Sequence, residues 1–112
     1  MTTVSRQQNG IGVLEVAGPV DGATAGELDA AINELMPQVG YRLVLNLTGV
    51  PYISSIGLRV LLTALKRAKP IKGDVKICGA SETVTKIFRI AGFLTLFDLA
   101  PTEAAALERF GT

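Results

Sequence analysis

Two adjacent serines, Ser54 and Ser55, stand where an apolar segment gives way to a helical pattern. A serine just before a helix accepts a hydrogen bond from one of the backbone N–H groups that the first turn leaves unpaired. One cap needs only one serine, so Ser54 is predicted to be the cap and Ser55 to lie in the first turn. A group attached to Ser55 would meet the positive end of the helix dipole and free N–H donors. The position can therefore carry a phosphate without unfolding the chain.

The helix after these serines is indicated by an apolar stripe that runs until Lys69–Pro70 breaks the pattern. The stripe consists of Leu58, Leu61, Leu62, Leu65 and Ala68. At about 100° per residue, Ser55 shares one side of the helix with Arg59, at the edge of this stripe, and is expected to be at least partly exposed. Ile56 and Val60 either pack under a neighbouring helix or form an exposed patch. Burial is favoured because apolar residues are more often inside.

The first part of the chain predicts a hairpin and a helix. Val4–Gln8 and Ile11–Gly18 have strand patterns, and Asn9–Gly10 between them is a hairpin turn signal. Thr24–Glu27 has the spacing of a capping box before an amphipathic helix that Pro37 ends. Asp21 is an alternative cap or brace for the same helix.

The rest of the chain alternates strands and helices. Tyr41–Val50, Asp74–Ala80 and Leu94–Leu99 are predicted strands. Ser81 is a predicted N-cap of a helix that ends at Gly92, and Pro101–Thr102 opens a short terminal helix through Phe110. The predicted fold class is α/β: a mixed β-sheet opened by a hairpin, with about four helices packed on it.

Composition narrows the function classes. The chain has 112 residues, of which 48% are hydrophobic and 19% charged, so residues 1–112 are expected to form a single domain. The net charge is +1 and the charges are scattered, so no nucleic acid partner is expected. One cysteine, a polar start from Thr2 to Gly10, and no apolar run of about 20 residues favour a cytoplasmic protein without direct membrane insertion.

Enzymatic chemistry has little support in the sequence. The chain has no histidine, and its one cysteine, Cys78, lies inside a predicted strand and is expected to be a small buried apolar residue. The carboxylates Glu15, Asp21, Asp74 and Asp98 have no spacing that places them together as metal ligands. The glycine-rich segment before the first helix lacks a phosphate-loop pattern. No enzyme activity, cofactor or metal is therefore predicted.

Two long segments resemble the STAS domain family in its free-standing bacterial form, the anti-sigma factor antagonists. They are "LNLTGVPYISSIGLRVLL" and "VKICGASETVTKIFRIAGFLTLF", and the resemblance covers nearly the whole chain. The usual family motif is Asp-Ser-Ser-Gly-Leu, with the phosphate on the first serine. Aligned on Gly57–Leu58, the motif places Ser54 at its aspartate, Ser55 at the phosphoacceptor and Ile56 at its second serine. Asn46 also stands where relatives often carry aspartate, so two carboxylates close to the modification point are absent.

The resemblance implies a regulated binding protein. In the family, an anti-sigma factor that is also a serine kinase phosphorylates the antagonist, and a serine phosphatase removes the phosphate. Only the unphosphorylated antagonist binds the anti-sigma factor and so frees the sigma factor. The loops at one end of the sheet would gather the binding residues. This predicted partner surface consists of Asp21, Thr24, Ile53, Ser54, Ser55, Ile56 and Arg59.

Two other function classes stay open. One is a constitutive STAS scaffold or regulatory subunit, of the stressosome type or associated with a transporter, in which both serines are only structural. Incorporation of phosphate separates this class from the switch. The other is a small enzyme on an α/β scaffold, which the missing histidine and phosphate loop make the weakest of the three.

Overall fold

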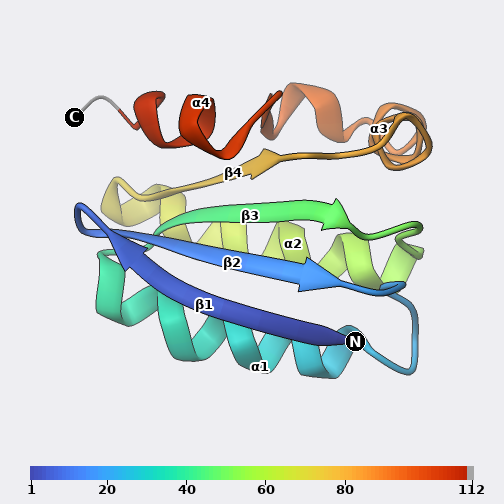
Figure 1. Cartoon of the computed structure of the whole chain (residues 1–112), viewed down its shortest axis with the longest axis horizontal. Helices are drawn as coiled ribbons and strands as arrows, with labels where there is room; N and C mark the ends of the chain where they lie inside the picture. The colour runs from blue at the N-terminus through green and yellow to red at the C-terminus, as the bar shows by residue number, and fades with distance from the viewer. Residues whose placement is uncertain (111–112) are drawn as a thin grey trace.

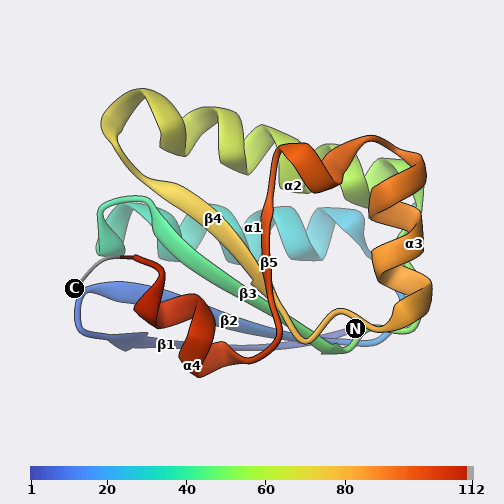
Figure 2. The ribbon, with the colours of Figure 1, turned by 90° about the horizontal axis from the view of Figure 1, so that it is seen from above.

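The computed structural model describes residues 1–110 as one mixed five-stranded sheet with helices on both faces, as Figures 1 and 2 show from two sides. The strands are β1 (Thr2–Gln8), β2 (Ile11–Ala17), β3 (Arg42–Gly49), β4 (Asp74–Cys78) and β5 (Asp98–Ala100), in that order across the sheet. The helices are α1 (Ala25–Leu35), α2 (Ser55–Ala68), α3 (Glu82–Ile90) and α4 (Glu103–Glu108). Short 3-10 turns, η1 (Met36–Val39), η2 (Lys69–Ile71) and η3 (Phe93–Thr95), follow the first three helices. The predicted fold class is confirmed.

The hairpin forms at the predicted turn. Asn9 and Gly10 both have positive φ, 54° and 76°, as a two-residue hairpin loop requires. From this turn β1 pairs antiparallel with β2 in unbroken register, from Gln8 opposite Ile11 to Thr2 opposite Ala17. The other strands run parallel to β2, so their carboxyl ends lie at one end of the sheet.

The two faces of the sheet bury different cores. The larger core joins one face to α1, α2 and α3, and it includes Leu14, Ile32, Leu45, Leu61 and Phe88. The smaller core lies under α4 and is built from Ile11, Val13, Val44, Cys78, Ala100 and Ala106. Successive strand residues point to opposite faces, so Asn46, two residues after Val44, belongs to the α4 face. The predicted burial of Cys78 is confirmed.

The last predicted strand is mostly wrong. In place of a strand over Leu94–Leu99, the chain forms η3 and then a three-residue β5. The Phe97 N–H donates to the Phe93 carbonyl at 3.0 Å, and the two rings stack with centroids 5.7 Å apart. Both rings also pack edge-on against the buried Phe88. This aromatic cluster favours a helical turn because it needs side chains four residues apart to face the same way.

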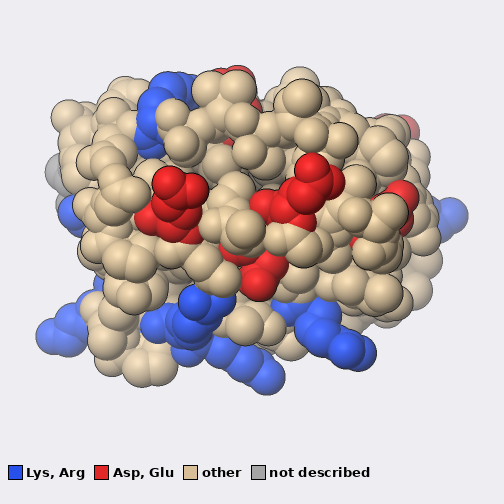
Figure 3. All heavy atoms as spheres, turned by 90° about the horizontal axis from the view of Figure 1, so that it is seen from below, with Lys and Arg blue, Asp and Glu red and all other residues tan. Residues whose placement is uncertain are grey.

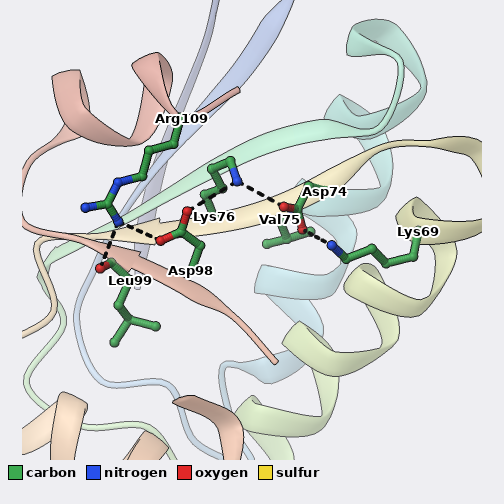
Figure 4. A network of polar contacts seen from close by, with 7 residues as sticks. All are labelled: Lys69, Asp74, Val75, Lys76, Asp98, Leu99 and Arg109. Carbon is green, nitrogen blue, oxygen red and sulfur yellow. Dashed lines mark hydrogen bonds and ion pairs between the residues drawn. The ribbon is translucent and has the colours of Figure 1, made fainter. Parts of the chain in front are cut away.

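A chain of alternating charges ties β4 to its neighbours (Figure 4). The Lys76 side chain is only 9% exposed, and its Nζ lies 3.1 Å from Asp74 Oδ2 and 3.3 Å from Asp98 Oδ2. Lys69 at the end of α2 holds Asp74 at 3.2 Å, and Arg109 after α4 holds Asp98 at 2.6 Å. A buried ammonium needs such partners because desolvation of an unpaired charge is costly. The network therefore fixes β5 and the end of α4 to the sheet.

This network predicts acid sensitivity. Burial acts to raise the pKa of Asp74, but hydrogen bonds from Lys76, Lys69 and the Val75 N–H outweigh it and lower that pKa below its ordinary value. A carboxyl whose pKa is depressed by folding stabilises the fold above its unfolded pKa, near 4, and loses this contribution as the pH falls through the folded value. We expect Asp74→Asn to be less stable than the parent chain at pH 7. The difference should shrink as chemical denaturation is repeated down to about pH 3. A difference that is constant with pH would contradict this role of Asp74.

Candidate functional site

Two loops at the carboxyl ends of β2 and β3 lie side by side. Val20 in the first loop and Ile53 in the second form a parallel β-bridge. The Val20 N–H donates to the Tyr52 carbonyl at 2.9 Å, and the Ser54 N–H donates to the Val20 carbonyl at 2.8 Å. The predicted proximity of the loops before α1 and α2 is therefore confirmed. The same hydrogen bonds fix where α2 begins.

Ser54 caps α2, as the sequence predicts. Its backbone is extended, with φ −80° and ψ 171°, and its Oγ accepts a hydrogen bond from the Gly57 N–H at 3.3 Å. The Ser54 carbonyl accepts from the Leu58 N–H at 2.9 Å. Ser55 is the first helical residue and is exposed. Within residues 1–110, no hydrogen bond is formed by the N–H groups of Ser55 and Ile56, which point out of the helix start.

Gly57 lets the two loops and α2 meet. A Cβ at this position would lie 2.6 Å from Val20 Cγ1 and 2.9 Å from Ile53 Cγ2. Val20 and Ile53 are 0% and 2% exposed, so neither side chain has room to move away. Glycine is therefore required here because of close packing. Burial also corrects one predicted contact: Ile53 supports the loop from inside and offers no side chain to a partner.

Asp21 and Thr24 shape the loop before α1. Asp21 Oδ1 accepts hydrogen bonds from the Ala23 and Thr24 N–H groups at 2.9 and 3.1 Å. Thr24 Oγ1 accepts from the Asp21 N–H at 3.0 Å and donates to the Pro19 carbonyl at 2.9 Å. The predicted capping box is wrong, because Thr24 has a helical ψ of −13° and its side chain turns back into the loop. Asp21 braces the start of α1, as the alternative expectation held.

Ile56 is exposed, and its predicted burial is wrong. Half of the residue, 50%, is accessible to solvent, whereas Val60 one turn on is partly buried against the core. The reason is local: Ile56 lies over Gly22, where a Cβ would be 3.6 Å from Ile56 Cδ1, and Gly22 is itself exposed. Tyr52 is similarly exposed, at 49%. The sequence places the loop from Val50 to Ile53 on the predicted partner surface but does not single out Tyr52, although an aromatic residue in a loop that leads to a helix is a signal for it.

Asn46 does not belong to this site, contrary to the expectation that it lies near the modification point. It is on the α4 face, where its Oδ1 accepts from the Thr48 N–H at 3.0 Å and from Thr48 Oγ1 at 2.6 Å. Its Nδ2 donates to Glu103 Oε1 at 3.3 Å. Glu103 also pairs with Arg6, and the hydrogen bond from Arg6 is the main cause that lowers the pKa of Glu103. An aspartate in place of Asn46 would repel Glu103, whereas the amide donates to it.

The described residues offer few other reactive groups. Burial raises the pKa of the Cys78 thiol to about 11, so the thiol stays protonated at neutral pH. Among residues 1–110, no three histidine, cysteine, aspartate or glutamate side chains are grouped to hold a metal ion. None of the helices in this part of the chain has the length and apolar character to cross a membrane.

The packing at Gly57 makes a stability prediction with a matched control. We expect Gly57→Ala to lower the free energy of unfolding by about 1–3 kcal/mol, because the new methyl group overlaps two buried side chains. Gly26, in the first turn of α1, has nothing within 4 Å of an added Cβ. Gly26→Ala should therefore be neutral or stabilise the chain by up to about 1 kcal/mol. Urea denaturation of both variants measures this, and equal effects would argue against a tight junction.

Comparison with known proteins shows similarity of sequence and of structure over almost the whole chain. Residues 2–106 match the STAS domain. BtrV of Bordetella bronchiseptica, which carries the name of an anti-sigma factor antagonist, is 36% identical over 95 residues, or 85% of this chain and 82% of BtrV. The crystal structure of an anti-sigma factor antagonist from Mycobacterium paratuberculosis superimposes with a TM-score of 0.89 at 25% identity, covering 99% of this chain and 94% of that one.

A more distant structure shares the fold alone. It is the Bacillus cell fate determinant SpoIIAA in its phosphorylated form, with a TM-score of 0.73 and 19% identity over 96% of this chain and 98% of SpoIIAA. The five-stranded sheet, the paired loops and the capped α2 described above thus occur in a chain whose sequence matches one family from β1 into α4. The chain belongs to the STAS domain family.

Proposed function

We propose that this chain is an anti-sigma factor antagonist and that phosphorylation of Ser55 switches off its binding to an anti-sigma factor. Relatives that are named anti-sigma factor antagonists support the general role. One observation carries the switch: the Ser55 side chain is free at the first residue of α2, because Ser54 already satisfies the cap. One serine builds the helix start, and the other is available for modification.

The start of α2 suits a phosphate. The N–H groups of Ser55 and Ile56 are open, and the helix dipole places partial positive charge at the same point. Arg59 lies one turn further along the same side of the helix, within the usual reach of an i, i+4 ion pair, and it is exposed. These groups offset much of the cost of the added charge within the chain. Phosphorylation should therefore leave the fold almost unchanged.

The surface around Ser55 suits protein binding. Tyr52 and Ile56 are both about half exposed on the segment that also presents Ser55. The loop beneath them is held by the Val20–Ile53 bridge and by Asp21, so it is ordered before a partner arrives. An ordered loop with exposed aromatic and aliphatic side chains costs little entropy on binding. Asp21, Thr24, Ile53 and Ser54 shape this surface, while Ser55, Ile56 and Arg59 would contact the partner.

The switch follows from charge. A phosphate adds about −1.5 to −2 charges at neutral pH. A partner docked over Tyr52 and Ile56 would bury this charge without a cation of its own, which typically costs several kcal/mol and lowers affinity by about a hundredfold or more. In this proposal the anti-sigma factor is the serine kinase, and a serine phosphatase restores binding.

The serine pair supplies its own control for this prediction. After exposure to the cognate kinase, we expect phosphate on Ser55, detected by peptide mapping, and at least about a hundredfold weaker binding to the anti-sigma factor by calorimetry. Ser55→Ala should bind normally and accept no phosphate. Ser54→Ala should still be phosphorylated at position 55 but lose about 1 kcal/mol of stability, because only Ser54 caps the helix.

Other outcomes would decide against parts of this proposal. Phosphate that maps to Ser54 would reverse the two roles. Full affinity of stoichiometrically phosphorylated protein would end the switch and leave a constitutive scaffold in its place.

Arg59 provides a second test of the binding surface. We expect Arg59→Glu to weaken anti-sigma binding by about tenfold or more, since a like charge at an interface is costly, while the melting temperature changes little. Lys66→Glu is the matched control, because Lys66 is an exposed cation on the same helix but lies in its last turn, about 16 Å along the helix axis from Ser55. Equal losses for both variants would show that net charge, and not this surface, governs binding.

A further inference from the structure

The sheet has one long open edge, formed by β1. Every residue of β1 is exposed, and its pairing with β2 has no register shift. Proteins usually protect such edges with proline, lysine, a bulge or a very short strand. The opposite edge uses the last of these, because β5 has only three residues. The seven residues of β1 contain no proline or lysine.

The hairpin register identifies which backbone groups of β1 are free. A two-residue loop is closed by a hydrogen-bonded pair, here Gln8 and Ile11, and bonded and non-bonded pairs then alternate along the hairpin. Val4 and Arg6 are therefore bonded to β2, whereas Thr3, Ser5 and Gln7 direct their N–H and C=O groups away from the sheet. Within residues 1–110, no other element hydrogen-bonds to the backbone of these three residues. They form a row of donors and acceptors ready to pair with another strand.

A groove lies beside this row of backbone groups. It encloses about 200 Å³ between β1 and α1, and Leu14 and Leu35 lie at its base. Ser5 and Gln7 line one wall, and Glu34 and Gln38 line the other. At one end a hydrogen bond from Gln7 Nε2 to Gln38 Oε1 at 3.2 Å joins the two walls and closes the groove. A strand edge next to a side-chain groove is the geometry by which extended peptides are recognised.

Among the residues that line the groove, Glu34 is acidic and Arg6 is basic, but Arg6 is paired with Glu103 of α4, so the remaining charge beside the groove is negative. Helix α1 carries Glu27, Asp29 and Glu34 and no basic residue. Glu27 and Glu34 are seven residues apart and so share one side of α1. Gln38 of η1 donates a hydrogen bond to the Glu34 carbonyl at 2.9 Å, while Asp29 faces Arg67 of α2 at 4.0 Å. Figure 3 looks onto this side of the molecule and shows acidic side chains across its middle, with lysines and arginines gathered along the neighbouring edge. Two copies paired through β1 would bring two such acidic helices together, which disfavours a second copy as the occupant.

We propose that the edge of β1 binds an extended segment of a partner protein as a sixth strand, and that this segment carries lysine or arginine on the side facing α1. The backbone groups of Thr3, Ser5 and Gln7 provide the pairing, and Glu34 selects the charge. This surface is separate from Ser55, because β1 and β3 are separated by β2 in the sheet. The two surfaces can be occupied together, and the proposal does not depend on the phosphorylation switch.

The experiment uses the whole chain and a capped seven-residue peptide in which valine and lysine alternate. We expect saturable binding of this peptide with a Kd at or below about 1 mM. Amide exchange measured by NMR should slow at Thr3, Ser5 and Gln7 and stay unchanged at Val4 and Arg6. A peptide with glutamate for lysine, and a fully N-methylated peptide that keeps the lysines but lacks N–H donors, should each bind at least about tenfold more weakly.

Charge reversal on the protein completes the test. Glu34→Lys should weaken binding of the lysine peptide by at least about tenfold, and Glu108→Lys, at an exposed acid on α4, should not. If the N-methylated peptide bound as tightly as the unmethylated lysine peptide, the proposal would be overturned, because binding would then depend on charge attraction and not on strand pairing. Absence of binding, or protection of the same three amides by self-association of the chain alone, would also overturn it. Sedimentation of the free protein detects self-association.

Discussion

The contact of Gly57 with Val20 and Ile53 is the constraint on which the rest of the site depends. It brings the first turn of α2 against two loops that come from different strands, at a spacing that no side chain larger than hydrogen permits. The hydrogen bonds of Val20 with Tyr52 and Ser54 then fix the residue at which α2 starts. Because that start is fixed, Ser54 is held in the cap and Ser55 is held outside.

Around this junction, the polar groups of the loops fall into two sets. Asp21, Thr24 and Ser54 spend their hydrogen bonds within the chain, on backbone groups that the ends of strands and helices leave unpaired. Ser55, by contrast, is exposed, as are Tyr52 and Ile56 in the same segment. The loop is thus held by hydrogen bonds at Asp21, Thr24 and Ser54, whereas the Ser55 hydroxyl is accessible to solvent. A phosphate on Ser55, in the function proposed above, would leave these contacts of the loop in place.

Charged side chains also fall into two groups, those that form ion pairs within the chain and those that are exposed. The network from Lys69 to Arg109 pairs each of its two carboxylates with two cations and anchors β5 and α4. The contacts among Arg6, Asn46 and Glu103 join β1 and β3 to α4. The acids Glu27 and Glu34 have no such ion pair among the described residues and stand beside the open edge of β1. Paired charges here stabilise the fold, whereas the exposed acids give the β1 edge a preference for a basic partner.

The sequence by itself determined the elements whose signals are local. The Asn9–Gly10 turn, the Ser54 and Ser81 caps and the Gly92 terminus each depend on a few consecutive residues, and each lies where it was predicted. Tertiary structure decided the rest. Because of tertiary packing, Ile53 is buried and Ile56 is exposed over Gly22. Leu94–Leu96, predicted as strand, lie in a helical turn beside the phenylalanine cluster. Tertiary packing also placed Asn46 on the α4 face, beside Glu103, and paired Lys76 with the carboxylate of Asp98, 22 residues away. These outcomes depend on which segments meet across the sheet, and periodicity along one segment carries no information about its neighbours.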